Sequence, residues 1–248
     1  MPLTQVEMKV STDINLFYLL QRPWELRRLA VAVQKGMSDE AFISRGGDFE
    51  QKVQEALIGS TFSWGGHHII SPASVRMARI HHEALDMEIH SDNGEMHSFE
   101  ITTLHPADLK IRLAYRDGKR PEIPSRAFSG EPIPAELIAS AIDKKTNKIQ
   151  GKGLCRHLLV YNNVYGGTTD LRRLPRLLNG AERTWDSIWV IAGIPYFGWI
   201  ALVSNSAGLK APALEKQLVA KGTPAFWGYW IDPSGFKLFE STGEVKAG

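Results

Sequence analysis

The chain has 248 residues, of which 43% are hydrophobic and 23% charged, as is ordinary for a folded soluble protein. No apolar run is long enough to cross a membrane, and a single cysteine excludes an internal disulfide or a multi-cysteine zinc site. With 29 basic and 27 acidic residues, the net charge of +2 gives no bulk attraction for nucleic acid, so any such role needs a local basic patch.

An N-terminal helical layer is expected over residues 1–46. The stretch 14–35 has a helical pattern that is interrupted at Pro23, because proline clashes with the preceding helical turn. A second helix is expected to begin at Asp48, a suitable N-cap, and to end at Gly59. The apolar face of this second helix consists of Phe49, Val53, Ala56 and Leu57.

A β-hairpin is expected over residues 85–103, preceded by an extended segment at 75–83. Its first strand alternates apolar and polar side chains, and residues 91–94 (SDNG) supply a turn in which Asn and Gly tolerate positive φ. Asp86 and Glu100 fall on the two adjacent strands, so their carboxylates converge if the side chains share a face. Paired carboxylates are typical ligands of hard cations such as Mg²⁺.

The stretch 105–134 is rich in proline and basic residues and has little regular pattern. It is either a solvent-exposed surface loop or a basic arm that lies along nucleic-acid phosphates, and the sequence favours neither interpretation. The candidate phosphate contacts in this stretch are Lys110, Arg112, Arg116, Lys119 and Arg120.

Residues 134–149 form the clearest helix of the chain, with three lysines towards its C-terminal end. The elements expected after it are a buried strand at 156–163, a short basic helix within 164–180, strands at 185–193 and 196–204, a helix at 211–222 and a closing hairpin at 226–241. This order predicts a single α/β domain built around a mixed sheet.

The order of helix, hairpin, helix and strand over residues 48–163 resembles the PD-(D/E)XK superfamily of restriction-endonuclease-like nucleases. The resemblance implies an αβββαβ core, taken as residues 47–163, whose mixed central sheet is flanked by helices. The residues outside this core are then extra N-terminal helices (1–46) and a C-terminal extension of strands and helix (164–248). In this family, an acid on the first helix, an Asp on one strand and an (Asp/Glu)-X-Lys on the next surround a Mg²⁺ site.

Asp86 matches the first Asp of that motif, Glu100 its second acid and Glu50 the helix acid. Leu85 stands in place of the motif's proline, and Thr102 stands in place of its catalytic lysine. Relatives with Glu-X-Thr exist, and in some members the lysine comes from the following helix. The resemblance therefore implies a substitute lysine, for which Lys145 is the first candidate, with Lys148 and Lys144 behind it.

The implied function is a Mg²⁺-dependent endonuclease that hydrolyses phosphodiester bonds, with DNA as the expected substrate. Mg²⁺ or Mn²⁺ would be bound by Asp86, Glu100 and the main-chain carbonyl of Ile101, with Glu50 holding a second metal or a metal-bound water. Lys145 would orient or activate the attacking water. The resemblance also leaves a homodimer open, since many such nucleases dimerise to cut both strands.

Two alternatives stay open on the sequence alone. The first is a catalytically inactive nuclease-fold protein that binds nucleic acid or a protein partner, and the second is a structural or assembly protein. Neither a nucleotide cofactor nor a zinc site is expected, because no glycine-rich phosphate loop and no HExxH-like spacing is present. The N-terminus lacks the features of a signal peptide, so a cytoplasmic, membrane-free protein is expected.

Overall fold

The computed structural model describes residues 14–36, 47–65, 70–79, 85–104, 134–149, 157–162, 171–193, 197–206, 225–232 and 235–240. The helical elements are η1 (Ile14–Tyr18), α1 (Pro23–Gly36), α3 (Gly47–Gly65), α5 (Ala135–Ile149), η5 (Leu171–Leu177) and η6 (Ala181–Arg183). The strands are β1 (Pro72–Met77), β2 (Met87–Ser91), β3 (Met96–Leu104), β4 (His157–Asn162), β5 (Ser187–Ala192), β6 (Phe197–Asn205), β7 (Ala225–Asp232) and β8 (Gly235–Glu240).

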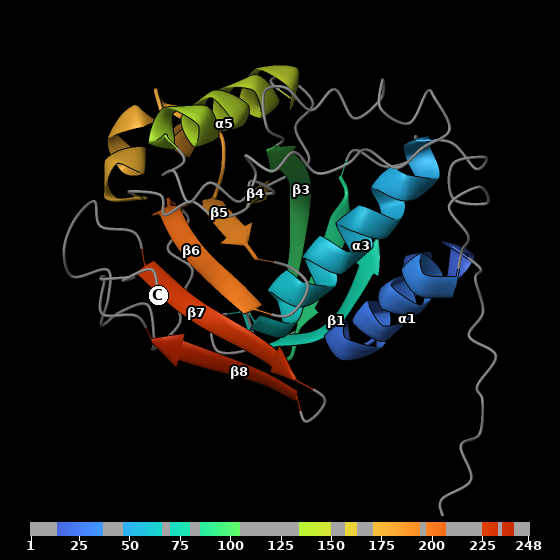
Figure 1. Ribbon diagram of the computed structural model, residues 1–248. Coiled ribbons are helices and arrows are strands. Elements are labelled where there is room, and N and C mark those ends of the chain that lie inside the picture. The colour runs from blue at the N-terminus through green and yellow to red at the C-terminus, as the bar shows by residue number, and fades with distance from the viewer. Residues whose placement is uncertain are drawn as a thin grey trace, which may run out of the picture.

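All eight strands join one mixed sheet in which spatial order follows sequence order (Figure 1). β3, β4 and β5 are parallel, while the remaining neighbours pair antiparallel. The parallel step from β3 to β4 spans α5, because parallel neighbours need a crossover connection. The prediction of an α/β fold around a mixed sheet is confirmed.

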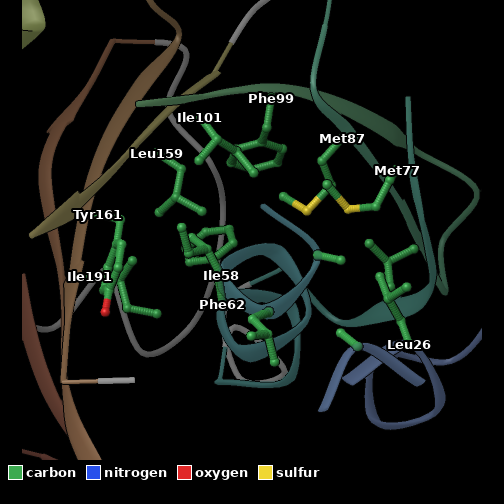
Figure 2. Close-up of a cluster of buried hydrophobic side chains, with 14 of the residues drawn as sticks. Leu26, Ile58, Phe62, Met77, Met87, Phe99, Ile101, Leu159, Tyr161 and Ile191 are labelled. Carbon is green, nitrogen blue, oxygen red and sulfur yellow. The ribbon is translucent and has the colours of Figure 1, made fainter. Parts of the chain in front are cut away.

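Each face of the central sheet is buried by a different set of helices. Ile101, Leu159 and Trp189 belong to the core on the side of α1 and α3, where Figure 2 shows Phe62 of α3 below Phe99. Leu158 and Val160 belong to a second core on the side of α5 and η5. Alternate residues of one strand thus enter opposite cores. A polar residue between two apolar neighbours on β3 therefore faces the α5 side.

Proline separates two N-terminal segments, as the sequence predicts. Pro23 is the first residue of α1, a position where its missing N–H costs nothing. Leu26, Ala30 and Val33 recur at helical spacing and are fully buried against the core. Residues 14–18 form a 3-10 turn instead of the expected continuation of an α-helix.

The prediction that Gly59 ends the second helix is wrong, because α3 continues to Gly65. A Cβ at position 59 would collide with the Met87 sulfur, so glycine serves here for close approach to the sheet and not as a helix cap. The helical turns after it bury Phe62 and Ser63 completely. The Ser63 hydroxyl donates a 2.6 Å hydrogen bond to the Gly59 carbonyl.

Gly59→Ala is expected to destabilise the protein by about 1–3 kcal/mol, the usual effect of overpacking a core. The added methyl displaces Met87, and this outweighs the gain of about 1 kcal/mol in helix propensity. Chemical denaturation of the single variants and of Gly59→Ala/Met87→Ala would measure the coupling. We expect alanine at position 59 to be less harmful once Met87 is truncated; equal effects in both backgrounds would contradict the contact.

The expected hairpin is confirmed as β2 and β3, with Met87 opposite Phe99 and Ile89 opposite His97. Gly94 adopts φ +85° in the connecting turn, as its sequence indicates. In the segment expected to be extended at 75–83, residues 75–77 belong to β1, residues 78–79 follow it outside the strand, and residues 80–83 lie outside the described residues.

Three neighbouring strands share a buried polar chain on the α3 side. His97 Nδ1 lies 3.4 Å from His157 Nε2, and His157 Nδ1 lies 2.8 Å from Ser187 Oγ. The Trp189 indole N–H donates to the same hydroxyl at 2.7 Å. These contacts tie β3, β4 and β5 together and satisfy polar groups that burial would otherwise penalise.

The C-terminal elements largely follow the sequence pattern. The strand expected at 156–163 is β4, those at 185–193 and 196–204 are β5 and β6, and the closing hairpin is β7 and β8. The short basic helix is the 3-10 element η5. The helix expected at 211–222 lies outside the described residues. None of the described helices is both long and apolar enough to cross a membrane.

Candidate functional site

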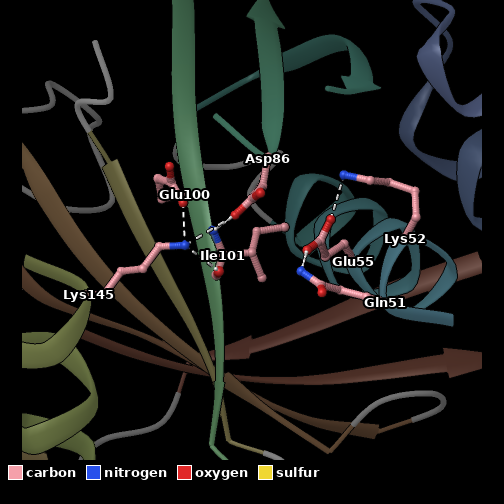
Figure 3. Close-up of polar contacts among 7 residues, drawn as sticks. All are labelled: Gln51, Lys52, Glu55, Asp86, Glu100, Ile101 and Lys145. Carbon is pink, nitrogen blue, oxygen red and sulfur yellow. Dashed lines mark hydrogen bonds and ion pairs between the residues drawn. The ribbon is translucent and has the colours of Figure 1, made fainter. Parts of the chain in front are cut away.

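Asp86, Glu100 and Lys145 meet where the start of β2, the middle of β3 and the last turns of α5 come together (Figure 3). The Lys145 ammonium forms an ion pair with Glu100 Oε2 and lies 3.6 Å from Asp86 Oδ2. It also donates a 3.3 Å hydrogen bond to the Ile101 main-chain carbonyl. One cationic atom therefore contacts two carboxylates and a carbonyl oxygen.

Local sequence explains why these groups converge. Phe99 and Ile101 are buried in the α3-side core, so the intervening Glu100 points to the α5 side. On α5, Ile138 and Ile142 pack into the second core, and Lys145 follows Ile142 by one helical turn. Its long side chain can therefore reach the edge of that core.

Asp86 is fixed by two hydrogen bonds to β3. Its own N–H donates to the Phe99 carbonyl at 2.9 Å, and its Oδ2 accepts from the Ile101 N–H at 2.8 Å. Because this hydrogen bond comes from the backbone, it orients the Asp86 carboxylate without the help of another side chain of the site. Asp86 therefore keeps its place beside Glu100 whether or not Lys145 is present.

The site holds more negative than positive charge. The side chains of Asp86, Glu100 and Lys145 are 21%, 12% and 15% exposed. Burial, with the Asp86 charge added, raises the pKa of Glu100 to about 7, although Lys145 acts in the opposite direction. Burial acts to lower the pKa of Lys145, but the charges of Asp86 and Glu100 outweigh it and raise that pKa. The ammonium thus stays charged and can neutralise only one carboxylate.

This imbalance predicts a pH-dependent stability. The raised pKa of Glu100 means that the folded protein keeps a proton up to about pH 7, whereas the unfolded chain releases it near its ordinary value of about 4.3. The free energy of unfolding should therefore fall as the pH rises between these values. We expect the wild type to lose about 3 kcal/mol more than Glu100→Gln between about pH 4.5 and 7.5. Urea denaturation at both pH values measures this difference, and parallel losses would contradict it.

A third carboxylate, that of Glu55 on α3, interacts electrostatically with the site and was not anticipated from the sequence. Its side chain is buried, with Lys52 Nζ at 2.6 Å from Oε2 and Gln51 Nε2 donating to Oε1 at 2.7 Å. Burial raises the pKa of Glu55 and the charge of Asp86 raises it further, while the charge of Glu55 helps to raise the pKa of Lys145. Figure 3 shows this α3 group beside Asp86.

Spacing along α3 could have identified Glu55. It precedes Gly59 and Phe62 by four and seven residues, so all three lie on one helical stripe that faces the sheet. A charged residue on such a stripe needs a polar partner or a functional reason. Glu50, the predicted helix acid, is a residue of α3, but the structure does not describe its side chain.

The other predicted residues are divided between the sheet, α5 and segments without a described structure. Thr102 lies on β3 two residues beyond Glu100, on the same face of the strand. Lys144 and Lys148 are exposed on α5, and Lys145 is the lysine that reaches the carboxylates. The basic residues predicted to contact phosphates lie outside the described residues: Lys110, Arg112, Arg116, Lys119 and Arg120.

The oxygen atoms around the ammonium fit a hard divalent cation. Asp86 and Glu100 offer carboxylates and Ile101 offers a carbonyl, which are the donor types that Mg²⁺ and Mn²⁺ prefer. Among the described residues, no three Asp, Glu, His or Cys side chains are grouped closely enough to chelate an ion. A cation here would accordingly use two side chains, one carbonyl and water, as Mg²⁺ often does in proteins.

No family model matches the chain, and no curated protein is significantly similar to it. A functional assignment therefore rests on the site itself. Its informative features are a largely buried pair of acids, a main-chain carbonyl and a lysine that contacts all three.

Proposed function

We propose that the protein is a metal-dependent nuclease that hydrolyses phosphodiester bonds, with DNA as its substrate. The observation that carries the proposal is the convergence of Asp86, Glu100 and the Ile101 carbonyl on the Lys145 ammonium. Two carboxylates that can bind a divalent cation, next to a protonated lysine, suit a reaction in which negative charge develops on a phosphate.

The order of elements supports the same assignment. The succession α3, β1, β2, β3, α5 and β4 is the αβββαβ order of the PD-(D/E)XK superfamily, with β3 and β4 parallel. Lys145 comes from the helix after the hairpin, as expected for the variant in which Thr102 replaces the motif lysine. Glu55 takes the place of a helix acid in this proposal, in preference to Glu50.

Asp86, Glu100 and the Ile101 carbonyl are the groups proposed to hold Mg²⁺ or Mn²⁺. When bound, such an ion lowers the pKa of a coordinated water and neutralises charge on the reacting phosphate. The Ile101 N–H keeps Asp86 oriented toward this position through its 2.8 Å hydrogen bond. The residues thus supply a preorganised set of oxygens, which lowers the cost of assembling the site.

Lys145 is proposed to act as a hydrogen-bond donor in the reaction. Its pKa is raised by the two carboxylates, so it remains an ammonium at neutral pH and cannot serve as a general base. An ammonium can orient a water molecule by donating a hydrogen bond to a lone pair of the water oxygen. It can also stabilise negative charge on a phosphate oxygen. Glu55 is proposed to accept a hydrogen bond from a water at the same site. The basic residues of 105–134 are proposed to contact the DNA backbone.

Cleavage assays with the purified chain test the proposal. Supercoiled plasmid and labelled double-stranded, single-stranded and RNA oligonucleotides are incubated with Mg²⁺, with Mn²⁺ or with EDTA. We expect DNA cleavage that needs the divalent ion and is lost in EDTA. Absence of cleavage of every substrate in either metal would contradict a nuclease.

One observation favours a second candidate, a nuclease-fold protein that binds nucleic acid without cutting it. Lys145 pairs with Glu100, and Thr102 occupies the motif position of a lysine. A site closed by its own ion pair could be inactive. Binding of labelled DNA in a gel-shift assay, without cleavage in Mg²⁺ or Mn²⁺, would support this candidate over the enzyme.

A further inference from the structure

The Lys145 ammonium lies among the same oxygen atoms that are proposed to bind the metal. Its nitrogen contacts Glu100 Oε2, lies 3.3 Å from the Ile101 carbonyl and 3.6 Å from Asp86 Oδ2. These are all three of the proposed ligands. The ammonium therefore acts as the cation of this site in the structure.

An ammonium and a divalent ion cannot share these oxygens. Both need the Glu100 carboxylate and the Ile101 carbonyl, and their like charges repel at short range in a largely buried site. The flexible four-carbon side chain of lysine allows the head group to move while α5 stays in place. Asp86 need not move, because its orientation is fixed by the Ile101 N–H.

We propose that Lys145 is an internal counter-ion that competes with the divalent metal, so that metal binding displaces its ammonium from Glu100 and the Ile101 carbonyl. This inference rests on the proposed metal site and specifies how that site is regulated. Without metal, the lysine neutralises the acid pair and closes the site. With metal bound, the released ammonium remains tethered at the rim, where a substrate phosphate would meet it.

Competition predicts that removing the ammonium strengthens metal binding. Isothermal titration with Mg²⁺ alone at pH 8.5, where Glu100 is largely ionised, compares the wild type with Lys145→Met and Lys145→Arg. We expect Lys145→Met to bind Mg²⁺ about tenfold more tightly, while Lys145→Arg keeps the positive charge and stays near the wild type. Lys148→Met is the matched control, because it removes the same charge from an exposed position of α5.

A second measurement uses the wild type alone, in case Lys145→Met does not fold. Brief acetylation followed by mass spectrometry reports how accessible and how basic each lysine is. Displacement should raise the labelling of Lys145 several-fold when Mg²⁺ is added, while Lys148 serves as the internal reference. Ca²⁺ in place of Mg²⁺ should have the same effect, since both prefer oxygen ligands.

The outcomes separate the two proposals. Metal binding to the wild type, with no gain in Lys145→Met or no increase in Lys145 labelling, overturns the competition but leaves the metal site standing. Weaker binding in Lys145→Met also overturns it, because the lysine would then assist the metal. No heat of binding and no Mg²⁺-dependent labelling in any variant overturns the proposed metal site and the competition together.

Discussion

Asp86→Asn is expected to lower the rate of Mg²⁺-dependent DNA cleavage by at least about a thousandfold. Metal ions contribute several kcal/mol of transition-state stabilisation, and each 1.36 kcal/mol corresponds to about a tenfold change in rate. Asparagine keeps the shape of Asp86 and can still accept the Ile101 N–H, but it lacks the charge that attracts the cation. Glu100→Gln should have a comparable effect, because Glu100 is the other carboxylate in contact with the Lys145 ammonium.

Two measurements distinguish lost catalysis from lost folding. Thermal unfolding without metal should show that Asp86→Asn remains folded, whereas the stabilisation that Mg²⁺ gives the wild type should disappear. Glu95→Gln is a suitable control, because Glu95 is an acid of the same hairpin whose side chain is 66% exposed. An Asp86→Asn protein that retains cleavage within a few-fold of an active wild type would remove Asp86 from the proposed chemistry.

The hairpin and α5 could be predicted because their signals are local. Turn residues fix the connection between β2 and β3, and alternation places Glu100 between two buried neighbours. The helical pattern of 134–149 places Lys145 beside a buried face. The structure brings the residues named from these patterns together, and their catalytic roles stay a prediction.

The sequence-based prediction failed where one element passes over another. Gly59 resembles a helix end when α3 is considered alone, and only the approach of Met87 from β2 explains a glycine inside the helix. Glu55 was missed for the same reason, because a helix that stops at Gly59 gives no reason to place this acid near Asp86. Contacts between residues far apart in the sequence carry no local pattern, so the helical stripe could mark Glu55 as a candidate but could not place it near Asp86.

The last turns of α3 therefore provide a direct stability test, in which Phe62→Ala is expected to cost about 3–5 kcal/mol. Phe62 is fully buried. Its ring meets Phe99 edge-on at 5.3 Å and Trp189 at 5.2 Å between ring centroids. Such pairs add to the loss of apolar burial. The effect is large compared with the about 5–15 kcal/mol that stabilises a typical domain.

Urea denaturation of Phe62→Ala, Phe62→Leu and Leu137→Ala measures this contribution. Leucine refills most of the space and should cost clearly less than alanine, whereas Leu137 is 50% exposed on α5 and its truncation should change stability by about 0.5 kcal/mol or less. A loss below about 1 kcal/mol for Phe62→Ala would mean that α3 does not pack on β3 beyond Gly59. Because Phe99 adjoins Glu100 on β3, that result would also remove the support that the core gives to the acid pair.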